Sequence, residues 1–303
     1  MNAQTVKVYR FLLILVLLSI GVAICGYWLC KQYLNKSIPA SVIIAIPYMF
    51  IPAISVLIVE RWQFKKIFMD YNLRLKGIHI SKSVKYILLT AFLLPVLILF
   101  FSYLFGNVFG FKEFGFFIIS KEDLDPLVFT TLPSFFSDFT LRILVGIPLL
   151  AITGLLSGCT INLFFALGEE IAWRGFLEKE IAISEKWKPL LIGAIWGLWH
   201  APLILMGYNY GAYHIGGVFV MIIVCIALAY YFSQALHQSL TLLVPAALHG
   251  IINSFSHAFA GDIFIKTGNP LLGSPIGLIF ALSVATLIFL LWLFRKRTPN
   301  EKT

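Results

Sequence analysis

Charged residues are scarce in this sequence, and their scarcity excludes an ordinary soluble fold. Only 12% of the 303 residues are Asp, Glu, Lys or Arg, whereas 60% are hydrophobic. A soluble domain carries about 25% charged and roughly 45–50% apolar residues. The chain has too few charges to cover a surface that faces water, so we expect one membrane domain surrounded by lipid instead of two soluble domains.

Signatures of several other function classes are also missing. None of the four cysteines has the paired CxxC spacing of a zinc site, so we expect them to be packing residues. The chain has no internal repeat, no low-complexity tract and no glycine motif for a dinucleotide or a phosphate. The net charge is +9, but no basic stretch is interleaved with base-stacking aromatics. We therefore expect no nucleic-acid partner.

Long hydrophobic runs are abundant instead. Runs of at least about 18 apolar residues can cross roughly 30 Å of hydrocarbon as helices, and they predict an all-α, polytopic transmembrane bundle of about eight helices. The predicted spans are 10–30, 41–59, 86–105, 145–168, 190–207, 215–233, 240–260 and 274–294. The first span resembles a signal peptide, but it is longer than the usual apolar core of about 7–15 residues and no small-x-small cleavage pattern follows it. We expect it to be a retained helix.

The distribution of Lys and Arg predicts the orientation of these spans. In this topology 17 cationic residues lie on one side of the membrane and 6 on the other. The cytoplasmic side carries the excess, so we expect both termini to be cytoplasmic in a multi-pass protein with membrane lipid as a partner. The 106–144 connection is rich in Phe and punctuated by Gly and Pro, which favours a position along the membrane interface.

Two adjacent carboxylates lie at the end of the fourth predicted span, where residues 168–174 read GEEIAWR. Residues four apart share one face of a helix, so Glu170 and Arg174 can pair while Glu169 points about 100° away. This spacing predicts one neutralised acid and one free acid. Taken alone, a solvated charge pair at a helix end in the membrane interface explains the cluster equally well.

The fifth predicted span carries a histidine at depth. His200 follows Lys188 by about 12 residues, or roughly 18 Å along a helix. An ionisable side chain at such a depth in the membrane faces the protein interior and indicates a functional site. Trp196 lies one turn earlier on the same face, and Pro202 should loosen the helix and free a carbonyl. A structural role for a lone histidine is the alternative.

The seventh predicted span carries His249 and Asn253 at i, i+4 spacing. Their side chains can donate to the same oxygen, as an oxyanion site requires. A hydrogen bond that joins packed helices is the alternative. Two carboxylates, two deep histidines and one deep asparagine on three spans are better explained by one site than by independent packing contacts.

Three motifs follow one another on these hydrophobic spans: Glu-Glu-x-x-x-Arg, aromatic-x-x-x-His and His-x-x-x-Asn. Their order resembles the CPBP family of intramembrane proteases, which includes the CAAX prenyl endopeptidases and bacterial proteins tied to bacteriocin processing and self-immunity. The resemblance implies that Glu169 and His200 activate a water while His249 and Asn253 hold the developing oxyanion. The substrate would be a peptide or protein segment presented at the cytoplasmic half of the membrane.

The same resemblance implies a supporting role for Glu170 and Arg174. Trp196 departs from the family, which usually has Phe at this position, but the aromatic ring is kept. By this resemblance residues 144–260 form a catalytic core, between the N-terminal helices and interfacial connection of 1–143 and the last helix and basic tail of 261–303. The breadth of the family suggests a bacterial host and therefore a location in a bacterial plasma membrane, where prenylated substrates are not expected.

The residues leave open whether a divalent metal such as zinc takes part. Zinc hydrolases usually offer three protein ligands and keep one position open for water, and Glu169, His200 and His249 are the candidate ligands. Without a metal, a glutamate in a low-dielectric pocket acts as the general base. No HExxH-like spacing places two ligands on one helix, so we favour the reaction without a metal.

Two other function classes fit parts of the same pattern. A proton-coupled transporter also uses Glu and His within the membrane as a proton relay, although the two halves of this chain show no repeat of the kind that many carriers have. A non-catalytic membrane protein, such as an immunity protein or a scaffold, would keep the fold without the chemistry.

Overall fold

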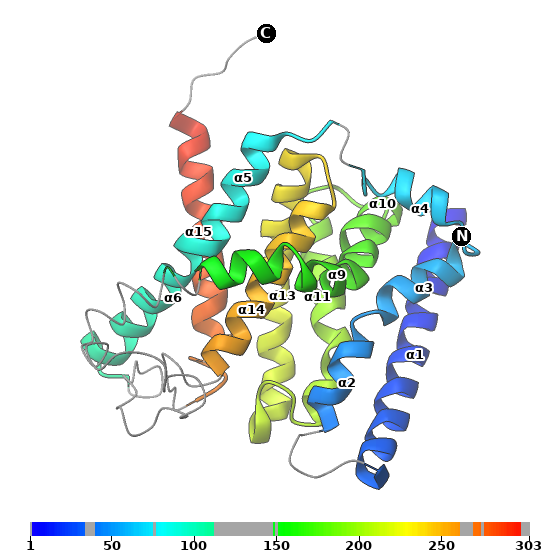
Figure 1. Ribbon diagram of the computed structural model, residues 1–303, viewed down its shortest axis with the longest axis horizontal. Coiled ribbons are helices and arrows are strands. Elements are labelled where there is room, and N and C mark those ends of the chain that lie inside the picture. The colour runs from blue at the N-terminus through cyan, green and yellow to red at the C-terminus, as the bar shows by residue number, and fades with distance from the viewer. Residues whose placement is uncertain are drawn as a thin grey trace.

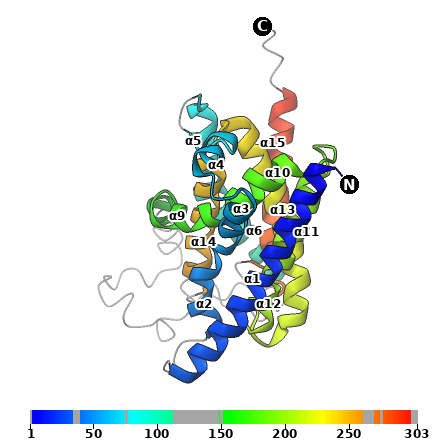
Figure 2. The ribbon, with the colours of Figure 1, turned by 90° about the vertical axis from the view of Figure 1, so that its right-hand side faces the viewer.

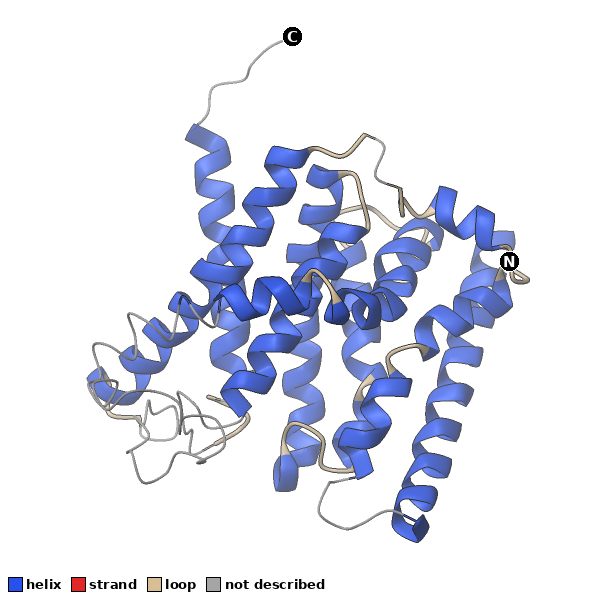
Figure 3. Ribbon diagram, in the orientation of Figure 1, coloured by secondary structure: helices blue, strands red, loops and turns tan. Residues whose placement is uncertain are grey.

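The computed structural model of the chain describes residues 2–33, 40–74, 77–111, 148, 151–260, 269–273 and 276–297. Within these ranges every regular element is a helix and no residue lies in a strand (Figure 3). The predicted all-α class is confirmed, and the apolar helices make the chain a multi-pass membrane protein. The predicted interfacial connection 106–144 lies almost wholly outside the described residues.

The first half of the chain forms straight helices and helices that are bent at short breaks (Figure 1). They are α1 (Ala3–Tyr33), α2 (Ala40–Tyr48), α3 (Ile51–Val59), α4 (Phe64–Asp70), α5 (Ile80–Leu88), η1 (Leu89–Leu93), α6 (Leu94–Tyr103) and η2 (Leu104–Val108). Both η1 and η2 are π-helical.

The second half contains the helices that carry the predicted site. They are Ala151–Gly158, α9 (Ile161–Glu170), the π-helical η5 (Ile171–Leu177), α10 (Glu178–Glu180), α11 (Lys188–Trp199), α12 (Ala201–Leu205), the short 3₁₀ turn η6 (Gly211–Tyr213), α13 (His214–Ser239), α14 (Leu243–Ala260) and α15 (Leu278–Arg297).

Each predicted span contains a helix, but the helices differ in how they could cross a membrane. Among the described residues, four helices are long and apolar enough on their own, and six spans result if two bent pairs each count as one. The bent pairs are Ile43–Val59 with Phe64–Asp70, at 108°, and Ala151–Gly158 with Ile161–Glu180, at 62°. The last two predicted spans contain shorter apolar helices, Leu243–Phe255 and Leu278–Phe294. The total of eight crossings remains a prediction.

The fourth predicted span, 145–168, overlaps one of the two bent helix pairs, and whether it crosses the membrane remains a prediction. The helix is interrupted by a turn at 159–160, and its two pieces, Ala151–Gly158 and Ile161–Glu180, meet at 62°. Figures 1 and 2 both show α9 beside α14. Close packing on α14 fixes the position of this helix pair, because a Cβ atom at Gly158 would lie 2.5 Å from the backbone nitrogen of Ile251. The end of α9 lies inside the bundle, where Glu169 and Glu170 are buried.

The first turn of α1 and the end of α15 lie at the same end of the bundle, together with α4, α10 and the start of α5 (Figure 1). These are the basic segments that the count of Lys and Arg assigns to one side of the membrane. Their assignment to the cytoplasm remains a prediction.

The outer surface of α1 is apolar, as contact with lipid requires. Leu13 and Leu17 are both 62% exposed and Ile24 is 65% exposed. Exposed apolar side chains at this density would destabilise a water-facing helix, whereas lipid solvates them without penalty.

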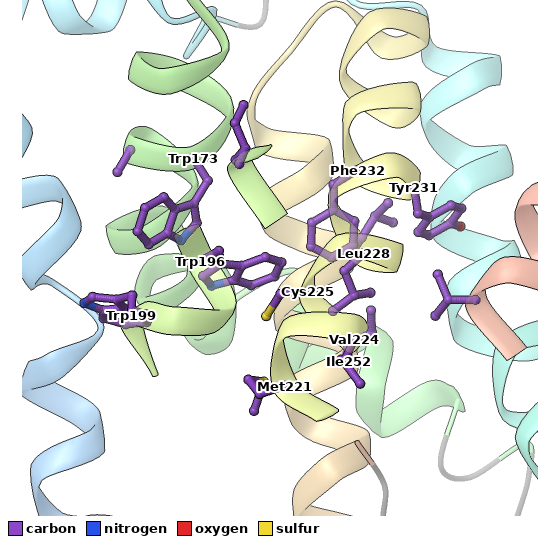
Figure 4. Packing of buried hydrophobic residues seen from close by; sticks show 14 of the residues in the cluster. Trp173, Trp196, Trp199, Met221, Val224, Cys225, Leu228, Tyr231, Phe232 and Ile252 are labelled. Carbon is purple, nitrogen blue, oxygen red and sulfur yellow. The ribbon is translucent and has the colours of Figure 1, made fainter. Parts of the chain in front are cut away.

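The helix α11 packs very closely on α13. A Cβ atom at Gly193 or Gly197 would approach the backbone of α13 to within 2.5 Å, and small residues at such crossings let helices associate in lipid. This contact fixes Trp196 in an aromatic core. The buried side chains around it include Trp173, Trp199, Cys225 and Phe232 (Figure 4).

Candidate active site

The two adjacent glutamates lie inside the bundle, at the point where α9 passes into the π-helical η5. Glu169 is 2% exposed and Glu170 is 0% exposed. A solvated charge pair at the membrane interface requires exposed carboxylates, so this alternative is wrong. Short π-helical segments occur frequently at functional sites because they alter the register of the side chains that follow.

Glu170 is held by two basic side chains. Nη1 of Arg174 lies 3.2 Å from Oε2 of Glu170 and donates a hydrogen bond of 3.3 Å to Oε1, as the i, i+4 spacing predicts. Nδ1 of His249 lies 2.8 Å from the same Oε1, and since a carboxylate oxygen accepts, Nδ1 carries the hydrogen. The sequence did not indicate this contact with His249.

The guanidinium of Arg174 is enclosed by aromatic rings. Its Cζ lies 4.5 Å from the ring centre of Trp196 and 4.9 Å from that of Phe232. Within the described residues, Nε and Nη2 of Arg174 and Oε2 of Glu170 are buried without a hydrogen-bond partner. Such atoms are few in native proteins, so this cluster differs from a fully satisfied structural ion pair.

Glu169 is held by neutral donors instead. The indole Nε1 of Trp196 donates to Oε2 of Glu169 at 2.7 Å, and Nε1 of Trp173 donates to the same atom at 3.4 Å. The second oxygen, Oε1, faces Nε2 of His249 at 4.0 Å, beyond hydrogen-bond distance. One carboxylate oxygen is thus fixed and the other is available to a reacting group.

His200 lies where the fifth predicted span breaks. α11 ends at Trp199 and α12 begins at Ala201, with Pro202 in its first turn, so the expected loosening by proline is confirmed. Nδ1 of the half-buried His200 lies 2.9 Å from the carbonyl oxygen of Trp196. A carbonyl only accepts, so Nδ1 carries the hydrogen and the neutral ring keeps Nε2 as an acceptor.

No hydrogen bond or ion pair links His200 directly to Glu169 or Glu170 in the described part of the chain. The sequence places these groups in one site, and in the described structure Trp196 contacts both of them. The indole of Trp196 contacts Glu169, and its carbonyl contacts His200.

His249 and the half-buried Asn253 lie one helical turn apart on α14. Two contacts fix this helix against the bent pair formed by Ala151–Gly158 and α9. A Cβ atom at Gly250 would lie 2.7 Å from the carbonyl oxygen of Gly158, and Nδ2 of Asn162 donates to the carbonyl oxygen of Gly250 at 3.2 Å. The close approach carries the His249 ring to the two glutamates.

The predicted metal ligands Glu169, His200 and His249 do not converge. Zinc ligands must reach one ion at about 2.0–2.3 Å. Among the described residues, one group of three potential ligands has its ligand atoms within 4.8 Å of one another, namely Glu178, Glu185 and His237. The donors at the candidate active site therefore do not fit a zinc centre in this arrangement.

Two residues of the site were not identified from the sequence. Trp173 follows Glu169 by four residues, which is the same spacing that predicts the contact between Glu170 and Arg174, so its position was a usable signal. Asn162 gave no such signal, because its partners lie on another helix.

A comparison with known protein families matches the part of the chain that carries this site. Residues 150–255 match the family described as type II CAAX prenyl endopeptidase Rce1-like, and this range contains all three motifs. The match confirms the predicted resemblance to the CPBP family and supports a peptidase. No curated protein matches the chain.

Proposed function

We propose that the chain, a member of the CPBP family by its Rce1-like residues 150–255, is an intramembrane endopeptidase in which Glu169 and His200 activate a water. The observation that carries the proposal is the environment of Glu169. Its carboxylate is buried, one oxygen is fixed by two indole N–H groups, and the other oxygen is left beside His249.

In the first step, Oε1 of Glu169 takes a proton from the water while the water oxygen attacks the peptide carbonyl carbon. General-base catalysis of this kind contributes roughly 10²–10⁴-fold to a rate. His200 holds the water through its second hydrogen, because the contact of Nδ1 with the Trp196 carbonyl leaves Nε2 as an acceptor.

His249 and Asn253 stabilise the negative oxygen that forms on the attacked carbonyl. Nε2 of His249 donates when the ring carries both hydrogens, and Glu170 balances this charge through its contact with Nδ1. Arg174 holds Glu170 in place. The tetrahedral species then collapses, the C–N bond breaks, and the proton on Glu169 passes to the leaving amine.

This mechanism requires no metal. The three candidate ligands do not meet around one point, and the residues that hold Glu169 are the neutral donors Trp173 and Trp196. A carboxylate held by neutral donors through one oxygen can accept a proton from the reacting water through its other oxygen, without a metal ion as its partner.

The substrate must present an extended segment to the cytoplasmic half of the membrane. A bacteriocin leader, a prenylated C-terminal motif and an unrelated membrane protein each satisfy this requirement. In a bacterial plasma membrane the first and the last are the substrates to test.

Cleavage of membrane-anchored peptides by the purified protein in detergent tests the proposal. We expect Glu169→Ala and His200→Ala to lose at least about 100-fold in rate, and Glu185→Gln, which removes an exposed carboxylate from the loop before α11, to keep the wild-type rate. Equal cleavage by all four proteins would refute the proposed roles.

Proton-coupled transport is the second candidate, because Glu169, Glu170 and His249 form a continuous buried group of ionisable side chains. Proton-driven uptake into proteoliposomes that depends on Glu169 would favour it. A non-catalytic immunity or scaffold role predicts instead that protection of cells survives Glu169→Ala.

A further inference from the structure

A second polar site lies at the end of the bundle where the chain begins. A cavity of about 330 Å³ opens between the first turns of α1 and the turn that joins α3 to α4. Four cationic side chains line it, and Glu60 is its one lining carboxylate. The cationic residues are Lys7, Arg10, Arg61 and Lys66.

Two of these cations are already paired. Lys7 bridges Glu60 and Glu180, and Nζ of Lys66 lies 2.7 Å from Oε2 of Glu60. Tyr71 donates a further hydrogen bond of 2.8 Å to Glu60. The single carboxylate of the cavity is therefore fully engaged.

Arg10 and Arg61 are exposed, and neither guanidinium group forms a hydrogen bond or an ion pair within the described residues. Their charges are thus available to a ligand, in a cavity where cations outnumber carboxylates. The guanidinium group binds phosphate oxygens in a bidentate manner, so the chemistry of the cavity suits a phosphate group.

The surroundings of the cavity indicate where that phosphate comes from. α4 is turned by 108° from the preceding helix, and its Phe64 and Phe68 are 63% and 51% exposed on one face. Trp62, in the turn, is 55% exposed. Exposed aromatic side chains beside cationic residues are typical of the headgroup level of a membrane, and basic pockets between membrane helices bind anionic headgroups.

We propose that this cavity binds the phosphate of an anionic phospholipid, with Arg10 and Arg61 as the phosphate ligands and the aromatic side chains of the turn and α4 against the acyl chains. This site is separate from the catalytic one. Lys7 and Lys66 add positive potential, while their pairing with Glu60 fixes the turn that presents Arg61.

Titration of the purified full-length protein in an uncharged detergent tests the assignment, with bound ligand counted by native mass spectrometry. The ligands are phosphatidylglycerol, phosphatidylcholine of the same chain length, and inorganic phosphate. We expect a preference for phosphatidylglycerol. The double variant Arg10→Gln/Arg61→Gln should weaken its binding about fivefold for each cation removed, or roughly 25-fold in all.

A matched control removes the same charge elsewhere at that end of the bundle. Lys82 and Lys85 are exposed on α5, and Lys82→Gln/Lys85→Gln should change phosphatidylglycerol binding by less than about twofold. An unchanged unfolding temperature of both double variants without lipid shows that the fold is intact. Equal binding of the two lipids, equal weakening by the two double variants, or binding of inorganic phosphate in preference to phosphatidylglycerol would each overturn the proposal.

Discussion

Glu60 and Glu169 are both buried carboxylates, 4% and 2% exposed, but their surroundings differ. Glu60 accepts hydrogen bonds from Lys66, Lys7 and Tyr71. Burial alone would raise the pKa of Glu60, yet these hydrogen bonds lower it to about 2. Its charge is fully compensated, as in a structural ion network.

Glu169 accepts only from the two indoles of Trp173 and Trp196, and no lysine or arginine contacts it in the described structure. The neighbouring Glu170 forms the ion pair with the guanidinium group of Arg174. The comparison shows that burial of a carboxylate does not by itself indicate chemistry. The indicator is a buried carboxylate that keeps one oxygen uncommitted.

Loss of Arg174 should have the largest effect on stability. Arg174→Leu leaves Glu170 buried beside His249 alone, and removal of one partner from a buried pair destabilises a protein by about 3–5 kcal/mol. Lys66→Gln removes a cation whose side chain is 43% exposed, and this change should be worth about 0–1 kcal/mol. Thermal unfolding in detergent compares the two variants, and equal shifts would contradict the distinction between the two clusters.

The role of the Trp196 indole N–H can be tested by a substitution that keeps an aromatic ring. Trp196→Phe removes the 2.7 Å hydrogen bond to Glu169 and keeps an aromatic side chain at this position. A hydrogen bond to a charged group contributes about 1.5–3 kcal/mol, so we expect kcat to fall at least about tenfold with little change in KM. The control is Trp199→Phe, whose indole donates to Ser19 instead. Equal kcat values for the two variants would show that the indole does not position Glu169.

The ion pairs and hydrogen bonds of Glu60 predict that the stability of the folded protein depends on pH. Its pKa is about 2 in the folded protein, below the ordinary value of 4.5. The resulting stabilisation is complete above about pH 4.5 and is lost as the pH falls from 4.5 towards 2. Between pH 5 and pH 3 the wild type should therefore lose more stability than Glu60→Gln, by roughly 1 kcal/mol once exposure of Lys66 is allowed for. Parallel unfolding curves for the two proteins would contradict this assignment.

Local features of the site could be predicted from the sequence. Helical spacing alone predicts the contact of Glu170 with Arg174, and Pro202 predicts the break at His200. These features depend on residues within four or five positions of one another. The hydrophobic runs likewise predict helices, because lipid requires every backbone group to be paired within its own segment.

The arrangement of the helices could not be predicted in the same way. The bent pair of Ala151–Gly158 and α9 packs on α14 because Gly158 and Gly250 let two backbones meet, and this contact joins residues about ninety positions apart. The contact of His249 with Glu170 follows from it. A run of apolar residues indicates that a segment prefers lipid or protein to water, but it carries no information on whether the segment runs along the bundle or across it.

Single-turnover cleavage of one membrane-anchored peptide by Glu169→Gln and Glu60→Gln tests the account most directly, because both changes remove a buried carboxylate and keep its shape. We predict that Glu169→Gln loses at least about 100-fold in the rate of the chemical step and that Glu60→Gln, once shown to be folded, stays within about twofold of the wild type. A Glu169→Gln variant that cleaves at the wild-type rate would contradict the central role of this carboxylate.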